Sequence, residues 1–171
     1  ASTAGVVARP GGGFRVERSA EFRQAPRLAS AGATSLDKPH AFVAMPFAAE
    51  LDDVYHYGIA RPVKDAGLLC ERVDQATFSG LIIERIRERI DSARVVIADL
   101  TLANPNVYLE VGYAWGRGRP TILLVRDVKD LRFDVQGYRC LVYGSIRALE
   151  ELLTAELGRL PPLAPGATHG P

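Results

Sequence analysis

The sequence has few of the residues that usually bind metals or form covalent cross-links. Its 171 residues include only two cysteines, Cys70 and Cys140, without metal-type spacing or a Cys-x-x-Cys pair. Each lies in an apolar, strand-like run, which favours reduced thiols in a core over a disulfide framework. The three histidines, His40, His56 and His169, are scattered along the chain. We therefore predict no metal site, no histidine-based nucleophile relay and no bound cofactor.

Long apolar runs are also missing. No stretch approaches the ~18 to 20 residues of a membrane-spanning helix, and the start lacks the basic and apolar regions of a signal peptide. A cytoplasmic protein without a membrane partner is the expectation. The chain begins with Ala1 rather than Met, which fits a piece of a longer protein or a processed chain.

The two signs of charge are nearly balanced: the sequence has 21 Lys and Arg against 20 Asp and Glu, a formal net charge of +1. A dense basic stripe with interleaved aromatic residues, the usual footprint of a nucleic-acid-binding surface, is absent from the sequence. We expect no direct nucleic-acid binding and favour a small-molecule ligand. Hydrophobic residues make up 47% and charged residues 24%, which is typical of a soluble globular domain.

The two ends of the sequence differ from its middle. Residues 1–38 are rich in Ala, Gly, Ser and Arg without a sustained period, which indicates a linker or tail, with a segment compatible with docking on a neighbour. Residues 161–171 are rich in Pro and Gly and are predicted to form a flexible tail. We assign the folded domain to residues 39–160.

Strand-like runs alternate with helical patterns between these ends. Four of the five runs precede a helical pattern, which is typical of a parallel α/β sheet. Right-handed crossovers then predict a flavodoxin-like doubly wound sheet in the order 2-1-3-4-5. In that order the first and third strands are neighbours, and ligands bind beyond their carboxyl ends. The five runs are residues 40–45, 68–73, 94–100, 121–125 and 139–143.

The helical patterns carry recognisable boundaries. Residues 50–67 form one helix that Pro62 should bend or restart, and residues 79–93 form another with Ser79 as a candidate N-cap. The last helix begins at Ser145 and directs four apolar residues toward the core. These are Ile146, Leu149, Leu153 and Leu157.

Two acidic residues stand near the expected ligand site. Asp99 ends the third strand, and Glu110 lies in the first turns of a helix that is predicted from Val107, so both carboxylates should face one crevice. Asp99 suits a helix or turn cap as well as a ligand contact. Spacing alone also leaves open whether Glu110 contacts a ligand or only stabilises the helix dipole.

The helix that carries Glu110 has two different faces. Its apolar residues Val107, Val111 and Ala114 should pack on the sheet. A second stripe is mixed polar and aromatic, and helical spacing places Asn106, Glu110, Tyr113 and Arg117 on it.

Several segments resemble the nucleoside 2-deoxyribosyltransferase-like proteins, whose fold is related to that of TIR domains. These segments are FVAMPF, VVIADLT, NPNVYLEVGYAWGRGRP and TILLV, and the likeness covers residues 41–143. The resemblance implies that Glu110 is the nucleophile that attacks the anomeric carbon and releases the base. It also implies that Asp99 contacts the base or sugar, that the turn at Met45-Pro46 lines the same pocket, and that a neighbouring subunit completes it in a homo-oligomer.

On this basis we predict cleavage of the N-glycosidic bond of a nucleoside, nucleotide or NAD, with Glu110 and Asp99 as catalytic residues. Because Leu100-Thr101 replaces the family's Asp-Gly, both hydrolysis and base exchange stay open. A TIR-like relative that hydrolyses NAD would be an effector of bacterial defence. The alternative is a non-catalytic nucleotide-binding or assembly module of the same fold. The predicted substrate contacts are Met45, Pro46, Phe47, Thr101, Asn106 and Tyr113.

Overall fold

The computed structural model describes residues 39–73 and 80–161. The predicted linker at 1–38 lies outside the described residues. The same holds for the tail from residue 162 onward and for Ser79, the predicted N-cap.

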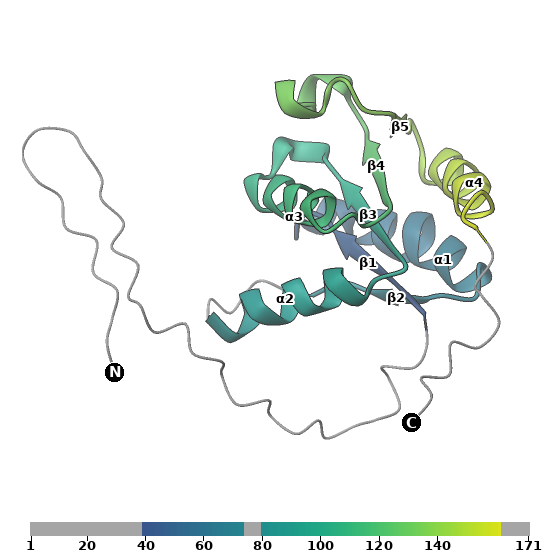
Figure 1. Ribbon diagram of the computed structural model, residues 1–171. Helices are drawn as coiled ribbons and strands as arrows, with labels where there is room; N and C mark the ends of the chain where they lie inside the picture. Colours follow the sequence, from purple (N-terminus) through teal and green to yellow (C-terminus); the bar gives the residue numbers. More distant parts are fainter. Residues whose placement is uncertain (1–38, 74–79, 162–171) are drawn as a thin grey trace, which may run out of the picture. The chain divides into compact units, whose positions relative to one another are not determined.

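Five parallel strands form one sheet in the order β2-β1-β3-β4-β5 (Figure 1). The central strands β1 and β3 consist only of buried residues, as expected for strands that are covered on both faces. The predicted flavodoxin-like order is therefore confirmed. The strands are β1 (His40–Ala44), β2 (Leu69–Glu71), β3 (Val95–Asp99), β4 (Thr121–Val125) and β5 (Cys140–Val142).

Helices cover both faces of this sheet (Figure 1). On one face lie α1 (Arg61–Asp65), α4 (Ile146–Leu157) and the π-helical stretch η2 (Val54–Ala60). On the other lie α2 (Gly80–Ser92) and α3 (Pro105–Gly116). Successive residues of a strand point to opposite faces, so Ile97 belongs to the first core and Val96 to the second. Short 3₁₀ turns are η1 (Ala49–Leu51), η3 (Thr101–Ala103), η4 (Val128–Asp130) and η5 (Phe133–Val135).

The helical segment after β1 changes its winding near Pro62. The π-helical stretch η2 ends at Ala60, and α1 begins at Arg61 with Pro62 in its first turn. Proline lacks an N–H group and clashes with the carbonyl four residues earlier, so a regular helix accepts it only in its first turn. The sequence predicted a bend or a restart at Pro62, and the structure shows a change of winding next to it within a continuous helical segment.

The start of α3 differs from the prediction, because the helix begins at Pro105 and not at Val107. The side chain of Asn104 accepts the N–H of Asn106 at 2.9 Å and acts as the N-cap. Pro105 then occupies the first turn, where its missing N–H costs nothing. The Asn-Pro-Asn segment is therefore the start of the helix and not its approach.

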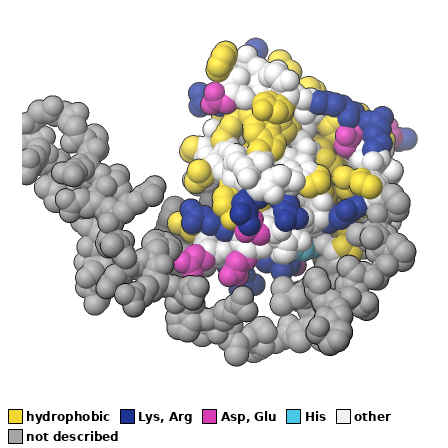
Figure 2. All heavy atoms as spheres, in the orientation of Figure 1, with side chains coloured by type: hydrophobic (Ala, Val, Ile, Leu, Met, Phe, Trp, Pro, Cys, Tyr) yellow, Lys and Arg dark blue, Asp and Glu magenta, His cyan; other side chains and the backbone are white. Residues whose placement is uncertain are grey.

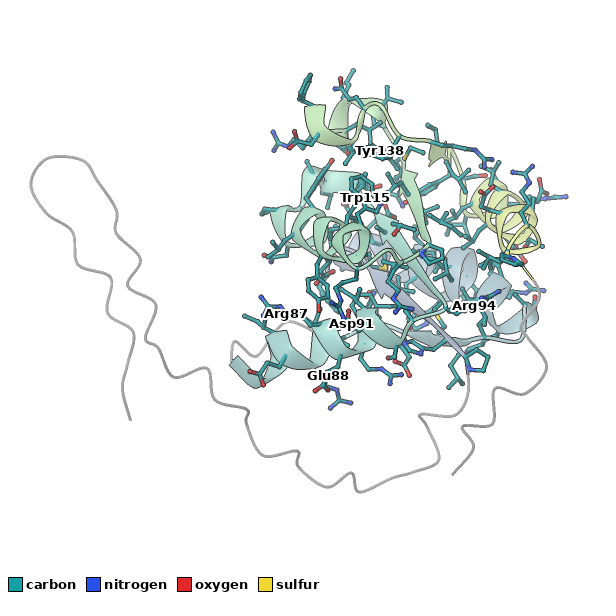
Figure 3. All side chains as sticks on the ribbon, in the orientation of Figure 1. Arg87, Glu88, Asp91, Arg94, Trp115 and Tyr138 are labelled. Carbon is teal, nitrogen blue, oxygen red and sulfur yellow. The ribbon has the colours of Figure 1, made fainter. Side chains whose placement is uncertain are left out.

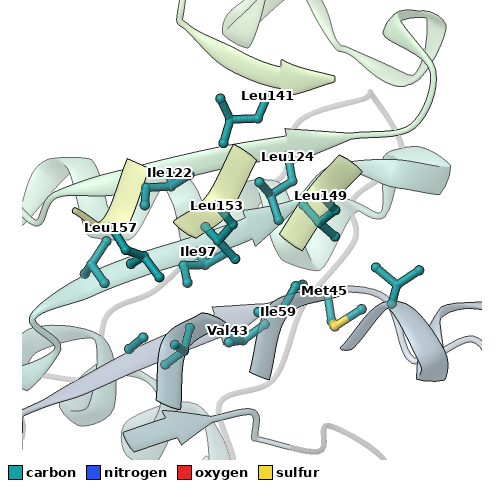
Figure 4. Packing of buried hydrophobic residues seen from close by; sticks show 14 of the residues in the cluster. Val43, Met45, Ile59, Ile97, Ile122, Leu124, Leu141, Leu149, Leu153 and Leu157 are labelled. Atoms are coloured by element: carbon teal, nitrogen blue, oxygen red, sulfur yellow. The ribbon is translucent and has the colours of Figure 1, made fainter. Parts of the chain in front are cut away.

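Helix α4 contributes a row of leucines to the first core, in agreement with the predicted pattern. Ser145 is its N-cap and accepts the N–H of Ala148 at 3.1 Å. Figure 4 shows the leucines of α4 lying over Ile97 and Leu124 of the sheet. The leucines are Leu149, Leu153 and Leu157.

Two adjacent leucines of α4 provide a test of this packing. Leu153 is 0% exposed and Leu152 is 38% exposed. We expect Leu153→Ala to lower the free energy of unfolding by about 2–5 kcal/mol, because it leaves a cavity. Leu152→Ala should cost less than about 1 kcal/mol. Urea denaturation measures both, and equal losses would contradict the described packing.

Candidate active site

The candidate site lies where β1 and β3 end side by side. Ala44 is opposite Ala98 in the register, so the turn from Met45 and the segment from Asp99 leave adjacent strand ends. The chain after β1 continues to helices on one face, and the chain after β3 continues to α3 on the other. This is the topological switch point at which ligands bind in open α/β sheets.

Asp99 is held at this switch point by two hydrogen bonds. Its side chain is 0% exposed. Oδ1 accepts the N–H of Thr101 at 3.0 Å, and Oδ2 accepts the hydroxyl of Tyr143 at 2.6 Å. Loss of solvation on burial raises the pKa of Asp99, although the bonds from Thr101 and Tyr143 act in the opposite direction. Asp99 thus caps the turn after β3, and its predicted contact with substrate stays a prediction.

Thr101 extends this network to the next strand. It is buried, and its Oγ1 accepts the backbone N–H of Arg126 at 3.1 Å. The same Oγ1 lies 3.4 Å from the hydroxyl of Tyr143. The segment after β3 is therefore fixed to the residues that follow β4 and β5. Sequence reasoning missed Tyr143, because nothing in the local pattern pairs a residue after β5 with one at the end of β3.

The link between β3 and α3 contains an unusual backbone conformation. Leu102 and Ala103 have positive φ angles of 66° and 48°. Non-glycine residues in this left-handed region cost about 1–2 kcal/mol each. Asp130 helps to hold the conformation, because its Oδ2 accepts the N–H of Leu102 at 2.9 Å. Strained links of this kind are concentrated at functional sites.

Glu110 lies on α3 among core residues. It is 7% exposed, and the adjacent residues Val107, Val111 and Ala114 belong to the second core, as predicted. Glutamate is rarely buried to this extent in proteins. The structure therefore places a carboxylate in a largely dry environment on the helix that follows the switch point.

The other residues of the polar stripe have different surroundings. Tyr113 and Arg117 both bind Asp91 of α2, through the Tyr113 hydroxyl at 3.1 Å and Arg117 Nε at 2.7 Å. Figure 3 shows Asp91 on the side of α2 that faces α3. Asn106 is exposed at the start of α3. The observed contacts of Tyr113 join two helices, and the substrate contacts of Tyr113 and Asn106 stay predictions.

The turn after β1 combines buried and exposed residues. Met45 and Pro46 are buried, whereas Phe47 is 44% exposed as a residue. Arg72 contacts this turn from the end of β2, with its guanidinium 4.4 Å from the centre of the Phe47 ring. Sequence reasoning missed Arg72, although the strand order places the residue after β2 beside the residues after β1.

Within residues 39–73 and 80–161, no group of three His, Cys, Asp or Glu side chains is arranged to hold a metal ion. Cys70 and Cys140 are free, as predicted. Burial raises the pKa of the Cys140 thiol to about 11 and also raises that of Cys70. Both thiols are therefore protonated near neutral pH. No helix in the described part of the chain has the length and apolar character needed to cross a membrane.

Solved structures share this fold. A 2-deoxyribosyltransferase from Leishmania mexicana matches with a TM-score of 0.51 at 15% identity, over 67% of this chain and 97% of its own. The CMP N-glycosidase BcmB from Clostridium botulinum matches with a TM-score of 0.54 at 16% identity, over 67% of this chain and 98% of its own. No protein-family model matches the sequence, and no curated protein matches it. At these identities the likeness establishes the fold.

Substitution of Tyr143 by Phe tests the buried network. The change removes the hydrogen bond to Asp99 and should lower the free energy of unfolding by about 1–3 kcal/mol at neutral pH. Because burial raises the pKa of Asp99, the native state binds a proton at higher pH than the unfolded chain does. The contribution of Asp99 therefore favours folding most in acid and declines as pH rises through its pKa.

Tyr143→Phe should lower the free energy of unfolding by less as pH falls through the raised pKa of Asp99. The reason is that a hydrogen bond to a protonated carboxyl is weaker than one to a carboxylate. Urea denaturation at several pH values from about 4 to 8 measures this dependence. Tyr138→Phe, at a position 55% exposed, is the control and should change little. A cost for Tyr143→Phe that grows in acid would refute the assignment.

Proposed function

We propose that this protein cleaves the N-glycosidic bond of a nucleoside, nucleotide or NAD, with Glu110 as the nucleophile. The observation that carries the proposal is the buried carboxylate of Glu110 on the helix that leaves the switch point. The fold, which is shared with a deoxyribosyltransferase and a CMP N-glycosidase, supports the same reaction class. The resemblance of the segment around Glu110 to this family supports the role of the glutamate.

Burial suits a carboxylate to this chemistry. As the bond between the anomeric carbon and the base nitrogen breaks, positive charge develops on the sugar, and a nearby negative charge in a dry environment stabilises it. A carboxylate oxygen of Glu110 then forms an ester with the anomeric carbon. The base leaves with the electron pair of the broken bond. A purine or pyrimidine base also takes up a proton from water, whereas nicotinamide leaves NAD as a neutral molecule and needs none. Water, or a second base, resolves the ester and regenerates the carboxylate.

Asp99 has a supporting role in this proposal. Both of its oxygens are engaged, by Thr101 and Tyr143, and the residue is 0% exposed. It therefore serves the reaction by holding the link that presents α3 and Glu110. A direct contact of Asp99 with the base or sugar requires one of these hydrogen bonds to open. In the turn after β1, Phe47 has the exposed ring for stacking on a base.

A homo-oligomer is part of the proposal, because exposed hydrophobic residues gather around α3. Figure 2 shows hydrophobic side chains over α3 and the loop after β4, and in Figure 3 Trp115 and Tyr138 lie next to each other there. Their rings stack with centres 4.2 Å apart. We propose that a second copy covers this surface. Its exposed members include Leu102, Leu109, Val128, Phe133 and Tyr138.

The nucleophile is tested by Glu110→Gln in the full chain. Wild-type protein, incubated separately with CMP, NAD and a set of nucleosides, should release free base from at least one of them. Glu110→Gln should lower this release by at least about 1,000-fold, because the amide cannot form the ester. Liquid chromatography measures the base, and mass spectrometry of acid-quenched wild type should find the sugar on the peptide that contains Glu110.

Glu88→Gln is the matched control, because Glu88 is an exposed helical glutamate of α2. It should retain wild-type activity. Tight nucleotide binding without turnover, unchanged by Glu110→Gln, would instead identify a non-catalytic binding module. The proposals that NAD is the substrate and that the protein acts in defence rest on the resemblance. Release of nicotinamide from NAD would support NAD as the substrate.

The oligomer is tested by Phe133→Ser, because Phe133 is 86% exposed. We expect sedimentation velocity to show a larger species for the wild type and a shift toward the monomer for the variant, since the apolar contact is lost. Tyr57→Ser, at a position 58% exposed on η2, is the control and should leave the distribution unchanged. A monomeric wild type would refute this part of the proposal.

A further inference from the structure

Arg72 occupies a special place relative to the candidate site. It directly follows β2, whose last residue Glu71 is opposite Phe42 of β1. Asp99 is the last residue of β3, and β3 pairs with β1 on the side opposite to β2. The turn after β1 is therefore flanked by Arg72 on one side and by the Asp99 network on the other.

The guanidinium of Arg72 contacts two aromatic rings at once. Its central carbon lies 4.4 Å from the ring centre of Phe47 and 4.4 Å from that of Tyr55. Nη1 donates to Sδ of Met45 at 3.7 Å, and Nη2 lies 3.6 Å from a carboxylate oxygen of Asp52. The Arg72 side chain is 17% exposed, so these contacts take it largely out of solvent.

These contacts join segments that the sheet itself does not hold. β1 ends at Ala44, so Met45 and Phe47 lie beyond the last strand pairing. Tyr55 belongs to η2, and Arg72 follows β2. A guanidinium is planar and weakly hydrated, and it stacks on aromatic faces in a way that a lysine ammonium cannot reproduce. One side chain thus connects the turn to η2 and to the end of β2.

We propose that Arg72 is a positioning residue, which fixes the Met45–Phe47 turn and thereby the exposed ring that is offered to the substrate. The inference rests on the proposed function, because the turn serves a substrate only if the site works there. Arg72 would act through Phe47 and not on the reacting atoms. Its loss should therefore weaken substrate binding and leave the chemical step at Glu110 nearly unchanged.

Hydrogen exchange of the 171-residue chain tests the positioning directly, whatever the activity. In Arg72→Gln, peptides from residues 45–55 should exchange several-fold faster than in the wild type, and peptides from β4 should not change. Arg61→Gln is the matched control, because Arg61 is 65% exposed in an ion pair with Glu150 at 3.5 Å on the neighbouring helix. Unchanged exchange at residues 45–55 in Arg72→Gln would overturn the proposal.

Steady-state kinetics with CMP as the probe tests the consequence for the site. Arg72→Gln removes two cation–π contacts of ordinary strength, and their loss should raise KM about five- to twenty-fold. The variant's kcat should stay within about two-fold of the wild type. Arg72→Lys should not return KM to the wild-type value, because lysine keeps the positive charge but lacks the planar guanidinium that stacks on the rings. Restoration by lysine, or a loss in kcat with KM unchanged, would overturn the inference.

A double-mutant cycle decides whether Arg72 acts through Phe47. In the Phe47→Ala background, Arg72→Gln should have little further effect on KM. Fully additive effects would refute action through the ring. If the wild type releases no base from CMP, NAD or the nucleosides, the proposed function fails, whereas the positioning of the turn is still decided by hydrogen exchange.

Discussion

The pair of hydrogen bonds to the buried carboxylate of Asp99 is the interaction on which the carboxyl edge of the sheet depends. One comes from the backbone of Thr101 and the other from the hydroxyl of Tyr143, 44 residues away in the sequence. A carboxylate without water is costly unless donors surround it, so both donors are needed once β3 is covered on both faces. The network joins the ends of β3, β4 and β5 and sets the direction in which the chain enters α3.

Glu110 depends on this arrangement, although it belongs to the opposite face of the sheet. The strand alternation directs Asp99 to the face of α1 and α4, together with Ile97 and Tyr143, whereas α3 packs on the other face. The two acidic residues thus occupy different layers of the fold. Asp99 fixes the backbone of the link, and Glu110 is carried by the helix that the link presents. On the other side of β1, Arg72 contacts Met45 and Phe47 of the turn.

Much of the fold could be predicted from the sequence, because it depends on periodic patterns. Uninterrupted apolar runs such as Val95–Ala98 require cover on both faces, and the leucine spacing of α4 defines its buried side. Pro62 and Ser145 marked helix boundaries through their own backbone chemistry. The start of α3 was misplaced by reading Asn104 and Pro105 as a loop, although an N-cap followed by a first-turn proline is itself a start signal.

The site was less predictable, because its contacts join residues that are distant in the sequence. The acidic position of Asp99 could be recognised, but its partner Tyr143 could not, since no local rule connects them. Arg72 lacks a signal of its own beyond its place after β2. The positive φ angles of Leu102 and Ala103 were also hidden, because such conformations are usually marked by glycine or asparagine.

Those left-handed residues have a consequence for how the protein tolerates change. A link made of glycine would adopt the same path without steric penalty, but it would also sample many others in the unfolded and native states. Leucine and alanine have the opposite effect: they raise the energy of the required path while narrowing the alternatives. At the entry to α3, residues that define the backbone path therefore also lower the stability of the folded state. A substitution by glycine there would relieve the strain but loosen the path.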